Sequence, residues 1–175
     1  MRVACLLDTD YEDSEFRLPY DALGAAGHEV TVVGFGAGVE LTGKRGEDSV
    51  TTDKSIHAVM PEDFDALLIP GGYSPDHLRG DQRMVDFTRA FFQRERPVFA
   101  VCHGPQLLMT AGVVTGRTLT AWKTIQADLA IAGAKVLDQE VVVDGNLVTS
   151  RQPSDLDAFN RESVALLDRV GAGAR

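Results

Sequence analysis

The segment Pro97–Met109, PVFAVCHGPQLLM, combines a cysteine with the local sequence that would present it for chemistry. A short apolar run, Val98–Val101, leads into Cys102, and a stretch compatible with a helix follows at once. Gly104 and Pro105 favour a tight turn and a helix start, because proline suits the first helical turn. A strand, a sharp turn and a helix would place Cys102 at an exposed, strained corner, as in a nucleophile elbow with cysteine in place of serine.

The same pattern bears on the reactivity of Cys102. At a helix N-terminus the partial positive charge favours the thiolate, which is the reactive form of cysteine. The alternative is a buried core cysteine, since free cysteines are among the most buried residues. The histidine, glycine and proline that follow favour the nucleophile. The second cysteine, Cys5, lies inside the apolar run Val3–Leu7 and is interpreted as a packing residue.

The elements that must position this corner alternate between strand and helix along the chain. We expect strands at residues 2–7, 29–33, 66–69, 98–101, 141–143 and 147–149, and helices at residues 14–27, 82–95 and 154–170. The first helix would be bent or broken near Pro19, and Ser154 would cap the last one. Asp144-Gly145-Asn146 predicts a hairpin, and the glycine-rich residues 34–53 predict a loop with a short hairpin. This alternation is typical of a mostly parallel sheet with helices on both faces.

Composition narrows the class of protein. A length of 175 residues predicts a single domain, 1–175, and a charged fraction of 25% is ordinary for a soluble chain. The net charge of −9 argues against a nucleic-acid scaffold, because it would repel backbone phosphates. No apolar run has the length of a signal peptide or a membrane span. Two cysteines without metal spacing indicate a reducing compartment, so we expect a cytoplasmic protein without a membrane partner.

Motifs for cofactors and metals are missing. Gly34, Gly36 and Gly38 suggest a dinucleotide loop, but the third glycine of that motif would fall on Val39 and no helical pattern follows. The chain has no phosphate-binding GxxxxGK[ST] segment and no HExxH segment. The histidines outside the cysteine segment occur singly, at His28, His57 and His77. We therefore expect neither a metal nor an organic cofactor.

Unusual residues follow three of the predicted strands, at the edge where open parallel sheets bind their ligands. An acidic segment, residues 8–15, follows the first strand, and Cys102 and His103 follow the strand at 98–101. Gly71 and Gly72 follow the strand at 66–69 and form either a simple turn or an oxyanion hole. In an oxyanion hole their backbone N–H groups would approach the reacting carbonyl group, and side chains at these positions would obstruct that approach. A thiolate, a carboxyl group and free backbone donors together predict a cysteine-nucleophile site.

Two carboxyl groups of the acidic segment suit such a site. Glu12 and Glu15 are three residues apart, so that both would face one pocket from the start of the helix. The alternative is that the acidic residues only complement the positive end of the helix dipole.

Several segments together resemble the PfpI-type intracellular protease/deglycase family. They are AVCHGPQLL, LLIPGGYSPDHLRGD, DTDYEDSEF, EVVVDGNLVTSRQP and FNRE, which run nearly from end to end of the chain. Within the family the likeness is greatest to bacterial stress proteins. The resemblance implies a flavodoxin-like α/β sandwich of three layers, related to class I glutamine amidotransferases, that assembles as a homodimer or a larger homo-oligomer.

The resemblance also implies roles for five residues. Cys102 matches the nucleophile, Glu15 matches a glutamate that hydrogen-bonds it, and His103 matches the adjacent histidine. Asp76 matches an acidic residue that orients this histidine from a neighbouring subunit across the interface, where archaeal members carry a glutamate, so this carboxylate is one methylene shorter. Trp122 matches an aromatic residue of the pocket. Some members have tyrosine at this position, so this chain lacks the tyrosine hydroxyl group.

The activities proposed for the family are peptidase, deglycase, glutathione-independent glyoxalase, and stress-protective chaperone or redox sensor. No segment marks a groove for an extended peptide, and a small pocket with a strong nucleophile suits a small adduct better. We therefore predict a cysteine-dependent deglycase that acts on early methylglyoxal or glyoxal adducts of amines and thiols, in small molecules or glycated proteins, and releases lactate or glycolate. The alternatives are an intracellular cysteine peptidase and a non-enzymatic sensor in which Cys102 is oxidised to the sulfinic acid.

Overall fold

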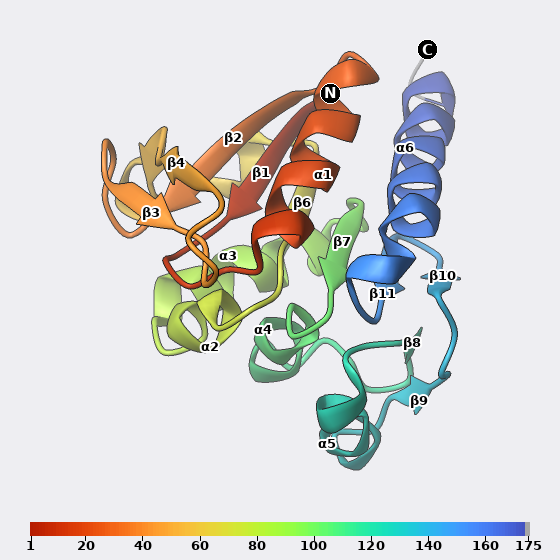
Figure 1. Cartoon of the computed structure of the whole chain (residues 1–175). Coiled ribbons are helices and arrows are strands. Elements are labelled where there is room, and N and C mark those ends of the chain that lie inside the picture. Colours follow the sequence, from red (N-terminus) through yellow and green to blue (C-terminus); the bar gives the residue numbers. More distant parts are fainter. Residues whose placement is uncertain (174–175) are drawn as a thin grey trace.

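A seven-stranded sheet forms the centre of the computed structural model, which describes residues 1–173 (Figure 1). Its strands are β1 (Arg2–Leu6), β2 (Glu29–Gly34), β5 (Lys54–Ser55), β6 (Ala66–Ile69), β7 (Val98–Val101), β10 (Val141–Asp144) and β11 (Leu147–Ser150). They lie in the order β10-β11-β7-β6-β1-β2-β5, and every neighbouring pair except β10 and β11 is parallel. This confirms the mostly parallel sheet and the hairpin between its last two strands.

Two small sheets lie outside the central one. One is an antiparallel hairpin of β3 (Glu40–Thr42) and β4 (Ser49–Thr51), as predicted for the glycine-rich loop. The other pairs β8 (Thr118–Leu119) with β9 (Lys135–Val136) in parallel, and its strands are too short to leave a pattern in the sequence.

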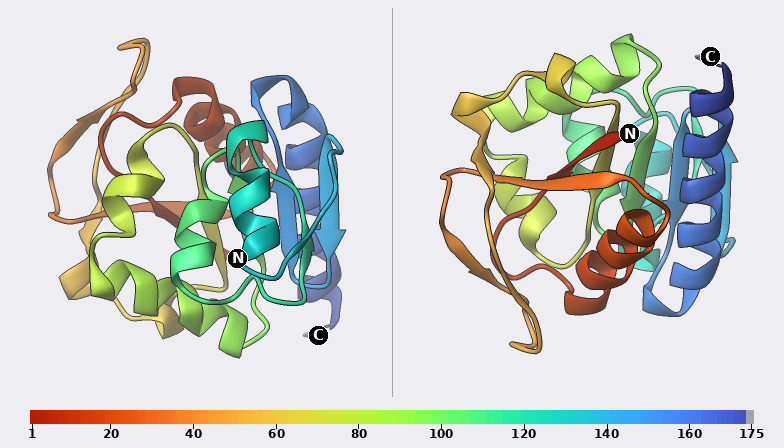
Figure 2. Two further views of the ribbon diagram at one scale, coloured as in Figure 1. Left: turned by 90° about the horizontal axis from the view of Figure 1, so that it is seen from below. Right: turned by 90° about the horizontal axis from the view of Figure 1, so that it is seen from above.

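Helices cover both faces of the central sheet (Figures 1 and 2). They are α1 (Asp13–Ala25), α2 (Ser74–Leu78), α3 (Gln82–Gln93), α4 (Pro105–Thr110), α5 (Gln126–Ile131) and α6 (Leu156–Gly173). Val3 and Cys5 of β1 pack on the side of α1 and α6, whereas Ala4 and Leu6 pack on the side of α3 and α4. Both faces of each central strand are therefore apolar, which explains the unbroken apolar runs. Among the helices of residues 1–173, none is long and apolar enough to cross a membrane.

The structure contradicts a predicted break in the first helix and a predicted serine cap on the last one, whereas a bend at Pro19 stays a prediction. The first helix runs through Pro19 without a break, because the missing N–H removes only one backbone bond while Phe16 and Leu23 keep that helix buried against the sheet. Ser154 does not cap the last helix. Pro153–Asp155 forms a separate 3₁₀ turn, in which the Ser154 hydroxyl accepts a hydrogen bond from Gln152.

The strand order positions the candidate residues. Cys5 lies opposite Leu68 and Leu68 lies opposite Phe99, so that β1, β6 and β7 end at the same edge of the sheet. The three loops that follow these strands therefore meet at that edge, as the sequence predicts.

Candidate active site

A strained corner joins β7 to α4. Cys102 has a φ of +60°, a left-handed conformation that is uncommon for a residue with a side chain. Its N–H donates to the Ser150 carbonyl at 3.0 Å, and its own carbonyl accepts from the Trp122 N–H at 3.0 Å. A Cβ atom at Gly104 would lie 2.5 Å from the Ile69 carbonyl oxygen, so only glycine lets the turn pass this close to β6. Neighbouring elements thus hold the backbone of Cys102 in its strained conformation.

The Cys102 side chain is buried, whereas the sequence predicted an exposed one. It is 7% exposed, because the Gly71 backbone and the Glu15 carboxyl group pack against it. Cys5 is completely buried in β1, which confirms its packing role. Cys102 is therefore the more accessible of the two cysteines, but only narrowly.

Glu15, from the first turn of α1, is a completely buried carboxyl group beside the sulfur. Neither of its oxygens has a hydrogen-bond partner within residues 1–173. Burial raises the pKa of Glu15 to about 8, although the facing Cys102 side chain acts in the opposite direction. At neutral pH Glu15 is therefore mostly protonated, and its O–H is available to the sulfur as a donor.

The ionisation of the Cys102 thiol depends on the charge of this carboxyl group. Burial raises the pKa of Cys102, and so does the Glu15 carboxylate, whereas the backbone N–H groups of His103 and Gly72 act to lower it. Burial therefore acts against the expected preference for the thiolate, and the helix that begins after Cys102 has only six residues. The preference for the thiolate stays a prediction. When Glu15 holds the proton its repulsion disappears, so a thiolate would have three donors around it.

Two glycines make room for this arrangement. A Cβ atom at Gly71 would lie 2.2 Å from Glu15 Oε2 and 2.8 Å from Cys102 Cβ. Gly72 has a φ of +77°, and a Cβ atom there would lie 2.3 Å from the Glu12 nitrogen. Any side chain at either position would separate the groups that face the sulfur. The structure thus brings the two glycines to the site, with the Gly72 N–H directed at the sulfur.

His103 lies beside the nucleophile and is half-buried. Its Nδ1 is 3.4 Å from Cys102 Sγ. Burial lowers the pKa of His103, the charge of Lys44 adds to this effect, and the charge of Asp76 opposes it. The ring is therefore neutral at neutral pH and able to accept a proton. The half-buried Trp122 ring lies 6.3 Å from the imidazole, centre to centre, and forms a wall of the site.

Asp76 is exposed on α2 and pairs with Arg79 at 2.8 Å. Within residues 1–173 no hydrogen bond joins it to His103, on which it acts only through its charge. The predicted contact across a subunit interface stays a prediction.

Glu12 is buried near Glu15, and its carboxylate is bound by two cations. Its role in a substrate pocket stays a prediction. Lys44 Nζ lies 2.7 Å from one oxygen and Arg45 Nε lies 3.3 Å from the other. The hydrogen bond to Glu12 is the main cause that raises the pKa of Lys44, and the charges of Glu15 and Cys102 add to it. Lys44 is thus a site residue that the sequence analysis missed. Its only signal was the pair of adjacent basic residues in a polar turn of an acidic chain.

Asp13 explains how the β3–β4 hairpin comes to the site. Its carboxylate accepts hydrogen bonds from the N–H groups of Arg45, Glu47 and Asp48 at 2.9–3.0 Å. Burial acts to raise the pKa of Asp13, but these bonds outweigh it, and the pKa is lowered. A Cβ atom at Gly43 would lie 2.2 Å from this carboxylate. Asp13 therefore ties the hairpin tip to the start of α1.

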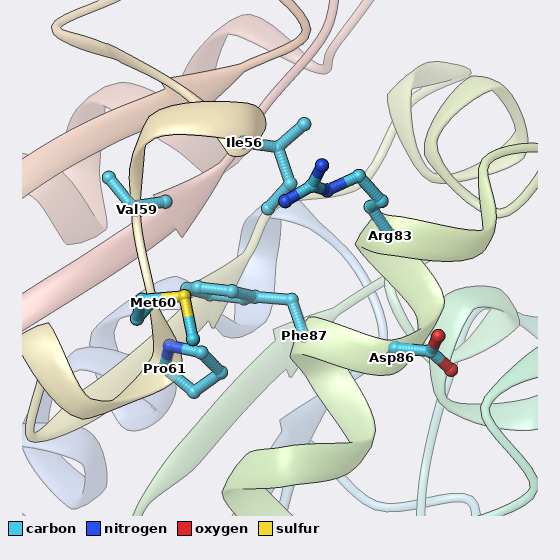
Figure 3. A pocket seen from close by; sticks show the side chains of 7 residues that line it. All are labelled: Ile56, Val59, Met60, Pro61, Arg83, Asp86 and Phe87. Atoms are coloured by element: carbon cyan, nitrogen blue, oxygen red, sulfur yellow. The ribbon is translucent and has the colours of Figure 1, made fainter.

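A separate cavity of about 240 Å³ lies between α3 and the segment before β6 (Figure 3). It is lined by Ile56, Val59, Met60, Pro61, Arg83, Asp86 and Phe87. None of these is a candidate residue, and none is a nucleophile, so this cavity is not part of the cysteine site.

Comparison with known proteins identifies the family of the chain. The profile of the DJ-1/PfpI family matches residues 1–166. The chain is 58% identical over 167 residues to Protein/nucleic acid deglycase 2 of Escherichia coli, covering 95% of this chain and 97% of that protein. It is 52% identical over 169 residues to General stress protein 18 of Bacillus subtilis, covering 96% and 98%. A two-domain Anabaena variabilis protein with DJ-1/ThiJ/PfpI-like and ferritin-like domains superposes with a TM-score of 0.91 at 40% identity, covering 97% of this chain and 48% of that one. The chain has the flavodoxin-like α/β fold of these proteins and belongs to the DJ-1/PfpI family.

Proposed function

We propose that this protein is a cysteine-dependent deglycase that removes early methylglyoxal and glyoxal adducts from amines and thiols. The observation that carries the proposal is the buried, mostly protonated Glu15 beside Cys102, with the N–H groups of His103 and Gly72 directed at the same sulfur. The name of the Escherichia coli relative supports this class of substrate.

The first step releases the amine from the adduct, whose carbon bears a hydroxyl group next to a ketone. Glu15, or His103 after it has accepted the hydroxyl proton, delivers a proton to the nitrogen as the C–N bond breaks. The hydroxyl proton passes to His103 or to the Glu15 carboxylate, which restores an aldehyde carbonyl. Cys102 Sγ then adds to the carbonyl carbon, while the neutral His103 ring accepts the thiol proton through Nδ1, which lies 3.4 Å from the sulfur. The oxygen that becomes negative accepts hydrogen bonds from the N–H groups of Gly72 and His103, as in an oxyanion hole.

The second step moves a proton from the sulfur-bearing carbon to the neighbouring ketone carbon through an enediol. The sulfur-bearing carbon is oxidised and the ketone carbon is reduced, so no external oxidant is needed. The product is a thioester of lactate with Cys102. Water hydrolyses this thioester, which releases lactate and restores the thiol. The net reaction of the adduct with water gives the free amine and lactate.

A homo-oligomer is part of this proposal. His103 lies next to the nucleophile in the chain, and a carboxylate would fix the orientation of its ring. Asp76 of a second subunit would supply that carboxylate, directly or through a water molecule. The exposure of Asp76 on α2 supports its availability to a partner.

The test measures lactate released from methylglyoxal adducts of N-acetylarginine and N-acetylcysteine by the purified protein. The buffer is free of Tris and other amines, which compete for methylglyoxal and imitate turnover. Wild type should release lactate with or without a chelator, and Cys102→Ser should not. Cys5→Ala is the matched control, because it removes the other thiol from the core and should keep the activity.

Lactate release no faster than that of Cys102→Ser would reject the deglycase. Hydrolysis of peptides that depends on Cys102 would then identify a peptidase. A function that appears only after oxidation of Cys102 would identify a sensor.

A further inference from the structure

Two contacts join the segment after β1 to α2. The Asp8 N–H donates to the hydroxyl of the completely buried Ser74 at 2.9 Å. The Asp8 carboxylate Oδ2 lies 3.0 Å from His77 Nδ1. Asp8 thus binds the first turn of α2 with its backbone and the last turn with its side chain.

These contacts continue a ladder between the two loops. The Tyr73 N–H donates to the carbonyl of Asp10 at 2.8 Å, and the Glu12 N–H donates to the carbonyl of Gly71 at 3.2 Å. An antiparallel bridge at Gly72 lies between these two bonds. The pairing with Asp8 is the outer rung of this ladder, and its inner rungs hold the N–H group that faces the sulfur.

The outer rung is needed because α2 has only five residues. Such a short helix is not stable by itself, because the conformational entropy lost in nucleation exceeds the stabilisation from one turn of hydrogen bonds. It nevertheless follows directly after the turn that holds Gly72, and it carries Asp76, whose charge acts on His103. A displacement of α2 would therefore shift both a donor to the sulfur and a charge on the base.

We propose that Asp8 and His77 are positioning residues of the active site, which hold α2 so that the Gly72 N–H stays directed at Cys102. The His77 Nδ1–H donates to the Asp8 carboxylate. Both side chains are partly exposed, so their pairing adds little to global stability, and its value lies in the alignment of the loop. This inference rests on the proposed function only for its kinetic readout.

The experiment compares His77→Phe with His77→Asn. Asparagine places an N–H donor near the position of Nδ1, whereas phenylalanine keeps the ring shape without a donor. Loss of alignment should raise the thiol pKa and slow alkylation of Cys102 by iodoacetamide at pH 7 by about tenfold, less than the loss of a whole oxyanion donor. In the lactate assay kcat should fall by about the same factor with KM unchanged. His77→Asn should stay within about twofold of wild type, and Asp8→Asn should add little to His77→Phe.

Asp65→Asn is the matched control, because Asp65 accepts a hydrogen bond from the Arg2 N–H at 2.8 Å at the other end of β1. It should leave the alkylation rate unchanged. Wild-type alkylation in His77→Phe, or an equal loss in Asp65→Asn, would overturn the positioning role. Alkylation needs no substrate, so this result stands apart from success or failure of the deglycase assay.

Discussion

Glu15 makes the folded protein less stable as the pH rises, and its replacement by glutamine should remove that effect. Its pKa is about 8 in the folded state against an ordinary 4.5. The unfolded chain therefore releases this proton first, and above its pKa the folded state binds more protons than the unfolded state. The free energy of unfolding should fall from about pH 4.5 to about pH 8 and become level above that.

The size of the effect follows from the same two values. Each pH unit between the two ionisations changes the free energy of unfolding by about 1.4 kcal/mol. Between the ordinary pKa and pH 7 the change is about 3 kcal/mol, a large part of the 5–15 kcal/mol that stabilises a typical domain. Glutamine has nearly the same shape, never ionises, and keeps an N–H donor for the sulfur. Glu15→Gln should therefore be more stable than wild type by about 3 kcal/mol at pH 7 and equal to it near pH 4, while losing activity because it cannot deliver a proton.

The assay is urea unfolding from pH 4 to pH 9, with Cys102→Ser in both proteins so that the thiol does not titrate. Glu12→Gln is the matched control. It is also buried but binds Lys44 and Arg45, so its neutral variant should lose stability at pH 7. A difference between Glu15→Gln and its parent that does not change with pH would refute the reasoning, as would a Glu15→Gln that is less stable at pH 7.

Three other outcomes are expected. Brief iodoacetamide treatment at pH 6 should label Cys102 much faster than Cys5, as read by mass spectrometry; equal labelling of the folded protein would contradict the assignment. Gly71→Ala should lower activity at least about 100-fold, because its Cβ would lie 2.2 Å from a Glu15 oxygen. Gly24→Ala, in open space on α1, is its control and should gain about 0.5–1 kcal/mol of stability; a fully active Gly71→Ala would show that the site tolerates the side chain. Asp13→Ala should expose the hairpin tip to proteolysis and lower the free energy of unfolding by about 2–3 kcal/mol at neutral pH. Because the pKa of Asp13 is lowered, that loss should shrink as the pH falls through the folded pKa, and a loss independent of pH would contradict it.

The sequence alone determined the elements whose signals are local. The strands at residues 66–69 and 98–101 have the predicted bounds, because a proline limits each apolar run, Pro70 after the first and Pro97 before the second. The hairpin after Val143 and the corner at Cys102 were predicted for the same reason, since turn residues act on their immediate neighbours. Together these patterns were sufficient to place a cysteine at the carboxyl edge of a parallel sheet.

The tertiary structure decided the electrostatics of that cysteine. The burial of Cys102, the retained proton on Glu15 and the approach of Lys44 all depend on contacts between loops far apart in the chain. The pair of Asp8 and His77 is a further case, because two residues far apart in the sequence meet only when β1 and β6 lie side by side. Desolvation and charge are properties of a surrounding volume, and a linear pattern records the neighbours in the chain without recording that volume.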